Sequence, residues 1–244
     1  MTAFFIQRSH RLIRLYHNLQ SPIYNMKKTT LFFCLLFLAS TAESVAQKKV
    51  SELMLVYDAS ITTGSTEPKI ADAFDGATTT VYIKGNLSRS EMASALFSST
   101  TIHDTKTGNA VVMREVSGQK LLIRMSPENW QEKNRRYQGV TFINTNERKT
   151  IAGYSCIKAE SKLPDGSLFT VYYTSDLVPE NKEYDYQFKN LNGLPLEYEL
   201  TQGKLKIKYT ISKINMNPVP ASKFDIPKSG YRELTYEESK KTSL

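Results

Sequence analysis

Alternation of apolar and polar residues is the dominant pattern along this chain. In the clearest stretch, the apolar residues Leu205, Ile207, Tyr209 and Ile211 alternate with lysines and a threonine. Successive side chains of a β-strand point to opposite faces, so such a stretch has one apolar and one polar face. This arrangement is typical of antiparallel sheets with one solvated face. Similar alternation recurs at residues 53–62, 79–83, 121–125 and 194–200.

One segment carries the signals of a helix. Ser126 is a suitable N-cap and Pro127 takes the first helical position, while basic residues gather at the far end, where the helix dipole favours cations. We therefore predict a helix over Pro127–Tyr137 that lies across the sheet. Ser88 and Glu91 match a capping box, but no 3.6-residue period follows them, so we predict a strand there.

The region from Met26 to Ala46 has the three parts of a secretory signal peptide. Two lysines precede the apolar run Leu31–Ala39, and small residues follow it, which predicts cleavage after Ala46 or Ala42. The run is too short to be a permanent membrane anchor. We interpret residues 1–25 as an extension upstream of the true start, and we expect a periplasmic or secreted protein.

Removing residues 1–46 changes the composition that bears on function. Five basic residues and one acidic residue lie in that region, so the net charge falls from +8 to +4, too small a bias for a dedicated nucleic-acid binder. We expect one β-rich domain over residues 47–231, a loose polar tail over 232–244, and no transmembrane segment in the mature chain.

The mature chain offers little for catalysis or metal binding. His103 is its one histidine and Cys156 its one cysteine, so the spacing of a metal site is missing, and we predict no catalytic residue and no cofactor. His103 beside Asp104 could serve as a base, but we expect a surface histidine. Cys156 could be a nucleophile, with Lys158 on the same strand face, but we expect a buried core residue. Carboxylates at 197 and 199 would share the solvent face of a strand.

Several short motifs resemble a group of exported bacterial proteins related to the GLPGLI type, which are grouped with the LolA/LolB lipoprotein-carrier-like fold. The motifs are Ile151–Ala159, Arg89–Met92, Val171–Thr174, Gly193–Leu196 and Phe224–Pro227. The second glycine of the GLPGLI signature is absent. The resemblance implies a strongly curved antiparallel sheet, a half-open barrel, with one or two helices on its concave side and an apolar cavity between them. It supplies no catalytic residues.

These observations favour a non-enzymatic periplasmic or envelope protein that binds a lipid, an acyl chain or another apolar ligand in the half-barrel. Aromatic side chains can line such a cavity. Our candidate lining residues are Trp130, Tyr137, Tyr57, Tyr172 and Tyr198. An envelope scaffold or protein-interaction module without a small ligand, with envelope proteins as partners, is an alternative. A thiol-dependent enzyme that uses Cys156 is a third.

Overall fold

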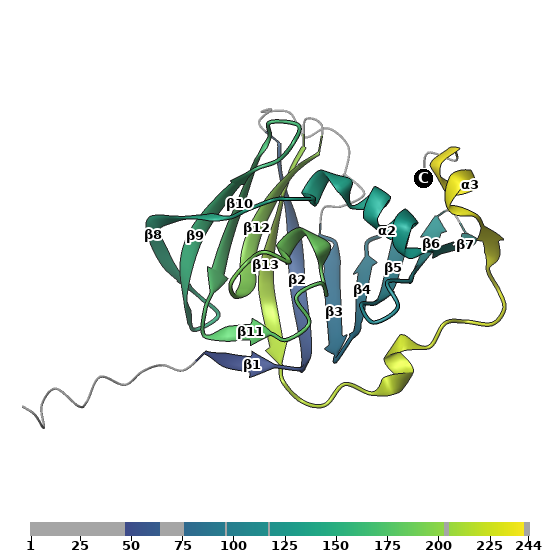
Figure 1. The fold of residues 1–244 in the computed structure, drawn as a ribbon, viewed down its shortest axis with the longest axis horizontal. Coiled ribbons are helices and arrows are strands. Elements are labelled where there is room, and N and C mark those ends of the chain that lie inside the picture. The colour runs from purple at the N-terminus through teal and green to yellow at the C-terminus, as the bar shows by residue number, and fades with distance from the viewer. Residues whose placement is uncertain (1–46, 64–75, 96, 117, 203–204, 242–244) are drawn as a thin grey trace, which may run out of the picture. The chain divides into compact units, whose positions relative to one another are not determined.

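A computed structural model describes residues 47–63, 76–95, 97–116, 118–202 and 205–241. The predicted signal peptide and the extension before it lie outside these residues. The described residues form a mainly β structure, dominated by one curved sheet of twelve strands (Figure 1). In spatial order its strands are β14 (Arg232–Leu234), β7 (Gln119–Met125), β6 (Ala110–Val116), β5 (Phe97–Asp104), β4 (Leu87–Ala93), β3 (Thr78–Lys84), β2 (Glu52–Thr63), β13 (Leu205–Asn215), β12 (Leu194–Gln202), β10 (Leu168–Thr174), β9 (Tyr154–Lys162) and β8 (Ile143–Ile151).

The sheet is not closed, because β14 and β8 each pair with one neighbour in it. All its pairs are antiparallel except β14–β7, which is parallel. A second, two-stranded parallel sheet joins β1 (Lys48–Val50) to β11 (Leu177–Pro179). The predicted fold class, a mainly β curved sheet with helices on one face, is confirmed. The correction is that the sheet is mixed, since its outermost strand β14 runs parallel to β7.

Burial along the strands follows the predicted alternation. On β2, Leu53, Leu55 and Tyr57 are buried, while Asp58 and Ser60 are exposed. We call the face that bears Leu55 and Tyr57 the inner face. Because register keeps side chains in rows across a sheet, the inner positions of neighbouring strands form one continuous core.

The inner face is covered by short helices and turns. The predicted helix forms as α2 (Pro127–Lys133) followed by the 3₁₀ turn η1 (Arg135–Tyr137). Ser126 caps α2 by accepting a hydrogen bond from the backbone N–H of Asn129 at 3.3 Å. A further 3₁₀ turn, η2 (Tyr186–Phe188), lies in the connection between β11 and β12.

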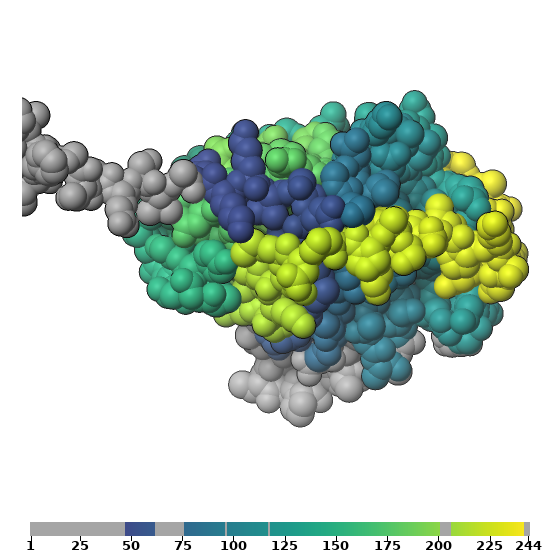
Figure 2. All heavy atoms as spheres, turned by 90° about the horizontal axis from the view of Figure 1, so that it is seen from below, coloured from purple at the N-terminus to yellow at the C-terminus, as the bar shows by residue number. Residues whose placement is uncertain are grey.

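The outer face is covered on one side by the chain that follows β13. Figure 2 shows this segment as a yellow-green band across the sheet strands. Its 3₁₀ turn η3 (Ala221–Phe224) contributes Phe224 to a small apolar cluster with Ile102 and Leu122. Arg89 on β4 holds this segment against the sheet by donating a hydrogen bond to the carbonyl of Lys223 at 2.9 Å.

The C-terminal residues correct one expectation. We predicted a loose polar tail from residue 232, but residues 232–241 form β14 and the helix α3 (Tyr236–Lys241). Leu234 and Tyr236 pack against the inner side of β6 and β7, which anchors both elements. Hydrophobic contacts that are distant in sequence therefore order a segment whose composition is polar. No helix among the described residues is long and apolar enough to cross a membrane.

Candidate ligand-binding site

Two adjoining cavities lie between the inner face of the sheet and the η2 turn, each about 150 Å³ in volume. They share Val81, Ser90, Tyr184 and Asp185 in their walls. The first, which we call the tyrosine cavity, is completed mainly by aromatic residues of β2, β12, β13 and η2. The second, which we call the histidine cavity, is completed mainly by residues of β4, β5 and α2.

Small inward-facing side chains on β4 and β5 explain why space remains. Ser88 pairs with His103 across these strands, and Ser90 pairs with Thr101. Elsewhere on the inner face the equivalent positions carry large apolar groups such as Leu55. Serine and threonine fill less volume than these residues, so the layer above them does not close on the sheet. The hydroxyl groups also make the cavity floor polar.

Unpaired polar atoms mark both cavities. Among the described residues, five buried side-chain N or O atoms lack a hydrogen-bond partner, and four of them belong to cavity-lining residues. These four are Thr79 Oγ1, Tyr184 OH, His103 Nδ1 and Trp130 Nε1. A buried polar group without a partner costs about 1–3 kcal/mol. Such a concentration in one place points to partners supplied by water or a ligand.

Asp185 brings a carboxyl group into both cavities. Burial raises the pKa of Asp185 to about 6, while hydrogen bonds from Gln187 act in the opposite direction. The side-chain amide of Gln187 donates to Oδ2 at 2.9 Å. Burial also raises the pKa of Tyr57 and Tyr198, with the charge of Asp185 as the second cause. The tyrosines are therefore protonated hydrogen-bond donors at all physiological pH values.

Asp185→Asn is expected to remove a pH-dependent part of the protein's stability. A folded-state pKa above the unfolded value stabilises the fold below about pH 4, and this contribution is lost as the pH rises through about 6. The full shift corresponds to about 3 kcal/mol, and access of water to the cavity should reduce this to about 1–2 kcal/mol. Urea unfolding of the wild type and of Asp185→Asn measures the difference at about pH 4.5 and at about pH 7.5, on either side of the pKa of about 6.

The exposed residue Asp58 on the outer face offers a matched control. Asp58→Asn removes the same carboxyl group at an exposed position and is measured at the same two pH values. If Asp185→Asn behaves like Asp58→Asn, the raised pKa of Asp185 is contradicted.

His103 differs from expectation. We predicted a surface histidine, but the side chain is 3% exposed and its ring stacks on that of Trp130, with centroids 4.8 Å apart. Burial is the main cause that lowers the pKa of His103, so the imidazole is neutral at pH 7. Asp104 points to the opposite face and accepts a hydrogen bond from the backbone N–H of Lys106. Adjacent strand residues alternate in direction, so the two do not form an acid–base pair.

The structure brings three of the five predicted lining residues to the cavities. Tyr57 and Tyr198 line the tyrosine cavity, and Trp130 lines the histidine cavity. Tyr137 instead packs beside the core, with its ring centroid 6.2 Å from that of Phe169. Tyr172 is on the outer face, so it does not line either cavity.

The surroundings of Tyr172 are charged. Its hydroxyl donates a hydrogen bond to Glu147, and the ammonium of Lys149 lies 3.7 Å from its ring centroid. Lys149 also pairs with Glu197 at 2.7 Å. Glu197 and Glu199 lie on this same face, as their alternation predicted, and each pairs with a lysine. This face of the sheet is an ion-pair network rather than a cavity wall.

Cys156 is buried, as predicted, with no exposed surface. Burial raises the pKa of the Cys156 thiol, which is the reverse of the shift that activates a nucleophilic cysteine. Lys158 pairs with Glu147 and Glu160, both at 3.1 Å, instead of with the thiol. Among the described residues, no group of three His, Cys, Asp or Glu side chains is arranged to hold a metal ion.

Sequence reasoning did not identify Thr79, Tyr184 or Asp185 as cavity-lining residues. The segment around 183–185 lies in a long connection with no periodicity, so its inward direction is set only by the packing of η2. The available signal was weak: hydroxyl residues occupy inward positions of β4 and β5 where apolar residues are usual.

Comparison with solved structures finds several chains that align with parts of this one. PNGF-II is 12% identical with a TM-score of 0.49, over 79% of this chain and 33% of that one, so this chain spans about a third of its length. MucB is 10% identical with a TM-score of 0.34, over 73% of this chain and 58% of that one. A beta-barrel-like protein of the domain of unknown function DUF1849 from Brucella abortus is 7% identical with a TM-score of 0.36, over 70% of this chain and 99% of that one.

No protein-family model and no curated protein matches the sequence. Identities this low carry no information on ligand or activity. Membership of the GLPGLI-related group therefore stays a prediction.

Proposed function

We propose that this chain is an exported, non-enzymatic binding protein of the periplasm or envelope, whose ligand is a lipid or another amphiphile with an apolar body. The ligand occupies the tyrosine and histidine cavities, with its polar end near Tyr184 and Asp185. The observation that carries this proposal is the concentration of unpaired buried polar atoms in two adjoining, aromatic-walled cavities.

The chemistry of the walls supports an amphiphile with an uncharged polar end. Tyrosine hydroxyls and the Trp130 indole N–H are neutral donors. Asp185, with a pKa of about 6, is mainly ionised at pH 7, so its negative charge disfavours an anionic group beside it. Aromatic rings such as Phe188 and Tyr198, whose centroids are 4.9 Å apart, provide the apolar surface. Together the cavities are near the lower end of the roughly 300–1,000 Å³ range of ligand pockets, so a short or medium acyl chain fits best.

Trp130 provides a built-in reporter, because it is the chain's one tryptophan and it lines the histidine cavity. The probe is 1-monodecanoylglycerol, which joins a medium acyl chain to a neutral, hydroxylated end. Titration should change the tryptophan fluorescence and saturate at one molecule per chain. Native mass spectrometry of protein isolated from the periplasm should show adducts of lipid mass.

Tyr184→Phe tests the polar end of the site. Removing the unpaired hydroxyl should weaken binding of 1-monodecanoylglycerol about 3–10-fold, because one hydrogen bond to the ligand is lost. Stability should not fall, since the hydroxyl has no partner within the protein. Tyr82→Phe, on the outer face, is the matched control and should bind like the wild type. A titration without a fluorescence change, together with lipid-free protein from the periplasm, would exclude the proposal.

A protein-interaction module is a second candidate function, favoured by the edge strand β8. Within the described chain β8 pairs only with β9, so one row of its backbone groups is open to a partner strand. Ile143 on β8 is 73% exposed and Leu168 on β10 is 58% exposed. Cross-linking in intact envelopes through residue 143 would capture a protein partner if this candidate is correct, while the fluorescence titration would be negative.

A further inference from the structure

A third cavity lies at the other end of the sheet, between β6, β7, α2 and α3, and it has a volume of about 390 Å³. It shares no lining residue with the tyrosine or histidine cavity. Ile123, Met125 and Tyr236 supply its apolar wall. Tyr236 belongs to α3 and packs with Ile123 and Met125 in one apolar cluster, so the C-terminal helix helps to form this cavity.

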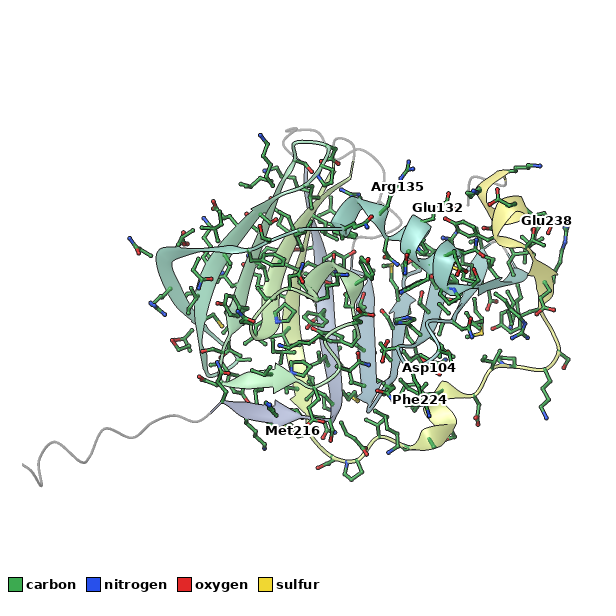
Figure 3. All side chains as sticks on the ribbon, in the orientation of Figure 1. Asp104, Glu132, Arg135, Met216, Phe224 and Glu238 are labelled. Carbon is green, nitrogen blue, oxygen red and sulfur yellow. The ribbon has the colours of Figure 1, made fainter. Side chains whose placement is uncertain are left out.

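Cations dominate the polar part of the wall. Arg114, Lys133, Arg135 and Lys240 line the cavity, against a single carboxylate, that of Glu132. We call this feature the basic cavity. Glu132 and Arg135 extend from α2 and η1 (Figure 3). An excess of positive charge over a concave surface concentrates anions there.

The cations differ in how far the protein neutralises them. Lys240 pairs with Glu132 at 3.1 Å and with Glu237 at 2.7 Å. Within the described part of the chain, no carboxylate lies within 4.0 Å of Lys133 or Arg135. By contrast, the outer-face lysines Lys149, Lys158 and Lys208 are each paired with a glutamate. Two cations of one concave wall are thus left to solvent or to a ligand.

The surroundings of Lys133 disfavour its positively charged form. The residue is exposed over part of its length, but neighbouring atoms desolvate its ammonium, and this desolvation is the first cause that lowers the pKa of Lys133. The positive charge of Arg114 is the second cause. Desolvation also lowers the pKa of Arg114. A bound anion would relieve both effects, because opposite charge favours the ionised forms.

We propose that the basic cavity binds a phosphate group carried by an amphiphilic molecule. The phosphate oxygens contact Lys133 and Arg135, with Arg114 close by, and the apolar part of the ligand lies on Ile123, Met125 and Tyr236. A phosphate monoester fits because its two negative charges and three acceptor oxygens match several donors at once. The apolar wall favours such an amphiphile over free phosphate, because free phosphate has no apolar part that could contact this wall. This site is independent of the ligand proposed for the other two cavities.

Isothermal titration calorimetry with three probes tests the proposal: octyl phosphate, octanol and inorganic phosphate. Octyl phosphate should bind tightest, because it has both the phosphate and the apolar chain. Weaker binding of inorganic phosphate identifies an amphiphile as the source of the anion. Equal binding of inorganic and octyl phosphate would overturn the role of the apolar wall and leave free phosphate as the ligand. Equal binding of octanol and octyl phosphate would overturn the whole proposal.

A pair of charge-matched double variants separates the site from general electrostatics. Lys133→Met with Arg135→Met should weaken octyl phosphate binding at least about tenfold, since two charge-assisted hydrogen bonds are lost. Lys106→Met with Lys213→Met removes the same charge at exposed positions outside this cavity, and should leave the affinity within about twofold. Equal losses in the two double variants would overturn the proposal.

Two further measurements keep the interpretation clear. If the double variant fails to fold, Arg135→Met alone, which changes one exposed residue, is compared with the wild type for octyl phosphate binding. Binding of 1-monodecanoylglycerol should be the same in the Lys133→Met, Arg135→Met protein as in the wild type. A failure of the basic cavity is thereby distinguished from a failure of the other two cavities.

Discussion

Phe169→Ala is expected to lower the free energy of unfolding by about 3–5 kcal/mol, the range for truncating a buried aromatic residue. Phe169 is 1% exposed and lies at the centre of the inner core. Its ring centroid is 5.7 Å from that of Phe142 and 5.7 Å from that of Phe188. The ring therefore joins strand β10 to the η2 turn, and its removal leaves a cavity that rigid strands cannot close.

The neighbouring residue Leu168 provides the control, because it is 58% exposed on the same strand. Leu168→Ala should change the stability by less than about 0.5 kcal/mol. Chemical denaturation with an unchanged slope gives both values. Phe169→Ala should also weaken binding of 1-monodecanoylglycerol, since Phe188 lines the tyrosine cavity. A loss for Phe169→Ala no larger than that for Leu168→Ala would contradict the central position of this ring.

Gly193→Ala is expected to destabilise the fold by about 3 kcal/mol or more, at the upper end of the cost of overpacking. A Cβ at this position would be 2.1 Å from the carbonyl oxygen of Thr174 and 2.6 Å from Cδ2 of Tyr173. The nearest obstacle is backbone, so a change of rotamer cannot relieve the contact. Thr174 pairs with Leu194 where β10 meets β12, and the two strands would have to separate.

Gly166→Ala is the comparison that isolates this close approach. Gly166 has a φ of +83°, but no atom lies within 4 Å of a Cβ at that position. Its substitution should cost only about 1–2 kcal/mol, for placing a non-glycine residue in the left-handed region. Thermal and urea unfolding of both variants measure the difference. Equal losses would mean that β12 can move away from Thr174 at little cost.

Local sequence rules predicted several of the elements. The alternation at residues 53–62 and 205–211 corresponds to β2 and β13, and the interpretation of 88–91 as a strand is confirmed by β4. Ser126 and Pro127 correctly marked the start of α2. These signals succeed because side-chain periodicity and capping depend on residues only a few positions apart.

The candidate site was predicted only in part. Alternation placed Tyr57 and Tyr198 on the inner face correctly, because both lie on strands with a strong pattern. The direction of Tyr172 could not be judged from the pattern alone, since its neighbours Val171 and Tyr173 are also large and apolar enough for a core. Asp185 is carried by an irregular segment, so its burial depends on how η2 packs onto the sheet.

By itself, the sequence determined the strands with clear alternation, the apolar faces of those strands and the helix that begins at Pro127, because these follow from periodicity, turns and caps within short windows. Only the tertiary structure decided that His103 is buried, that residues 232–241 are ordered and which buried polar atoms of the described residues have no hydrogen-bond partner. These features arise where segments far apart in the chain meet. Their energies come from desolvation and packing between elements, which no local pattern records.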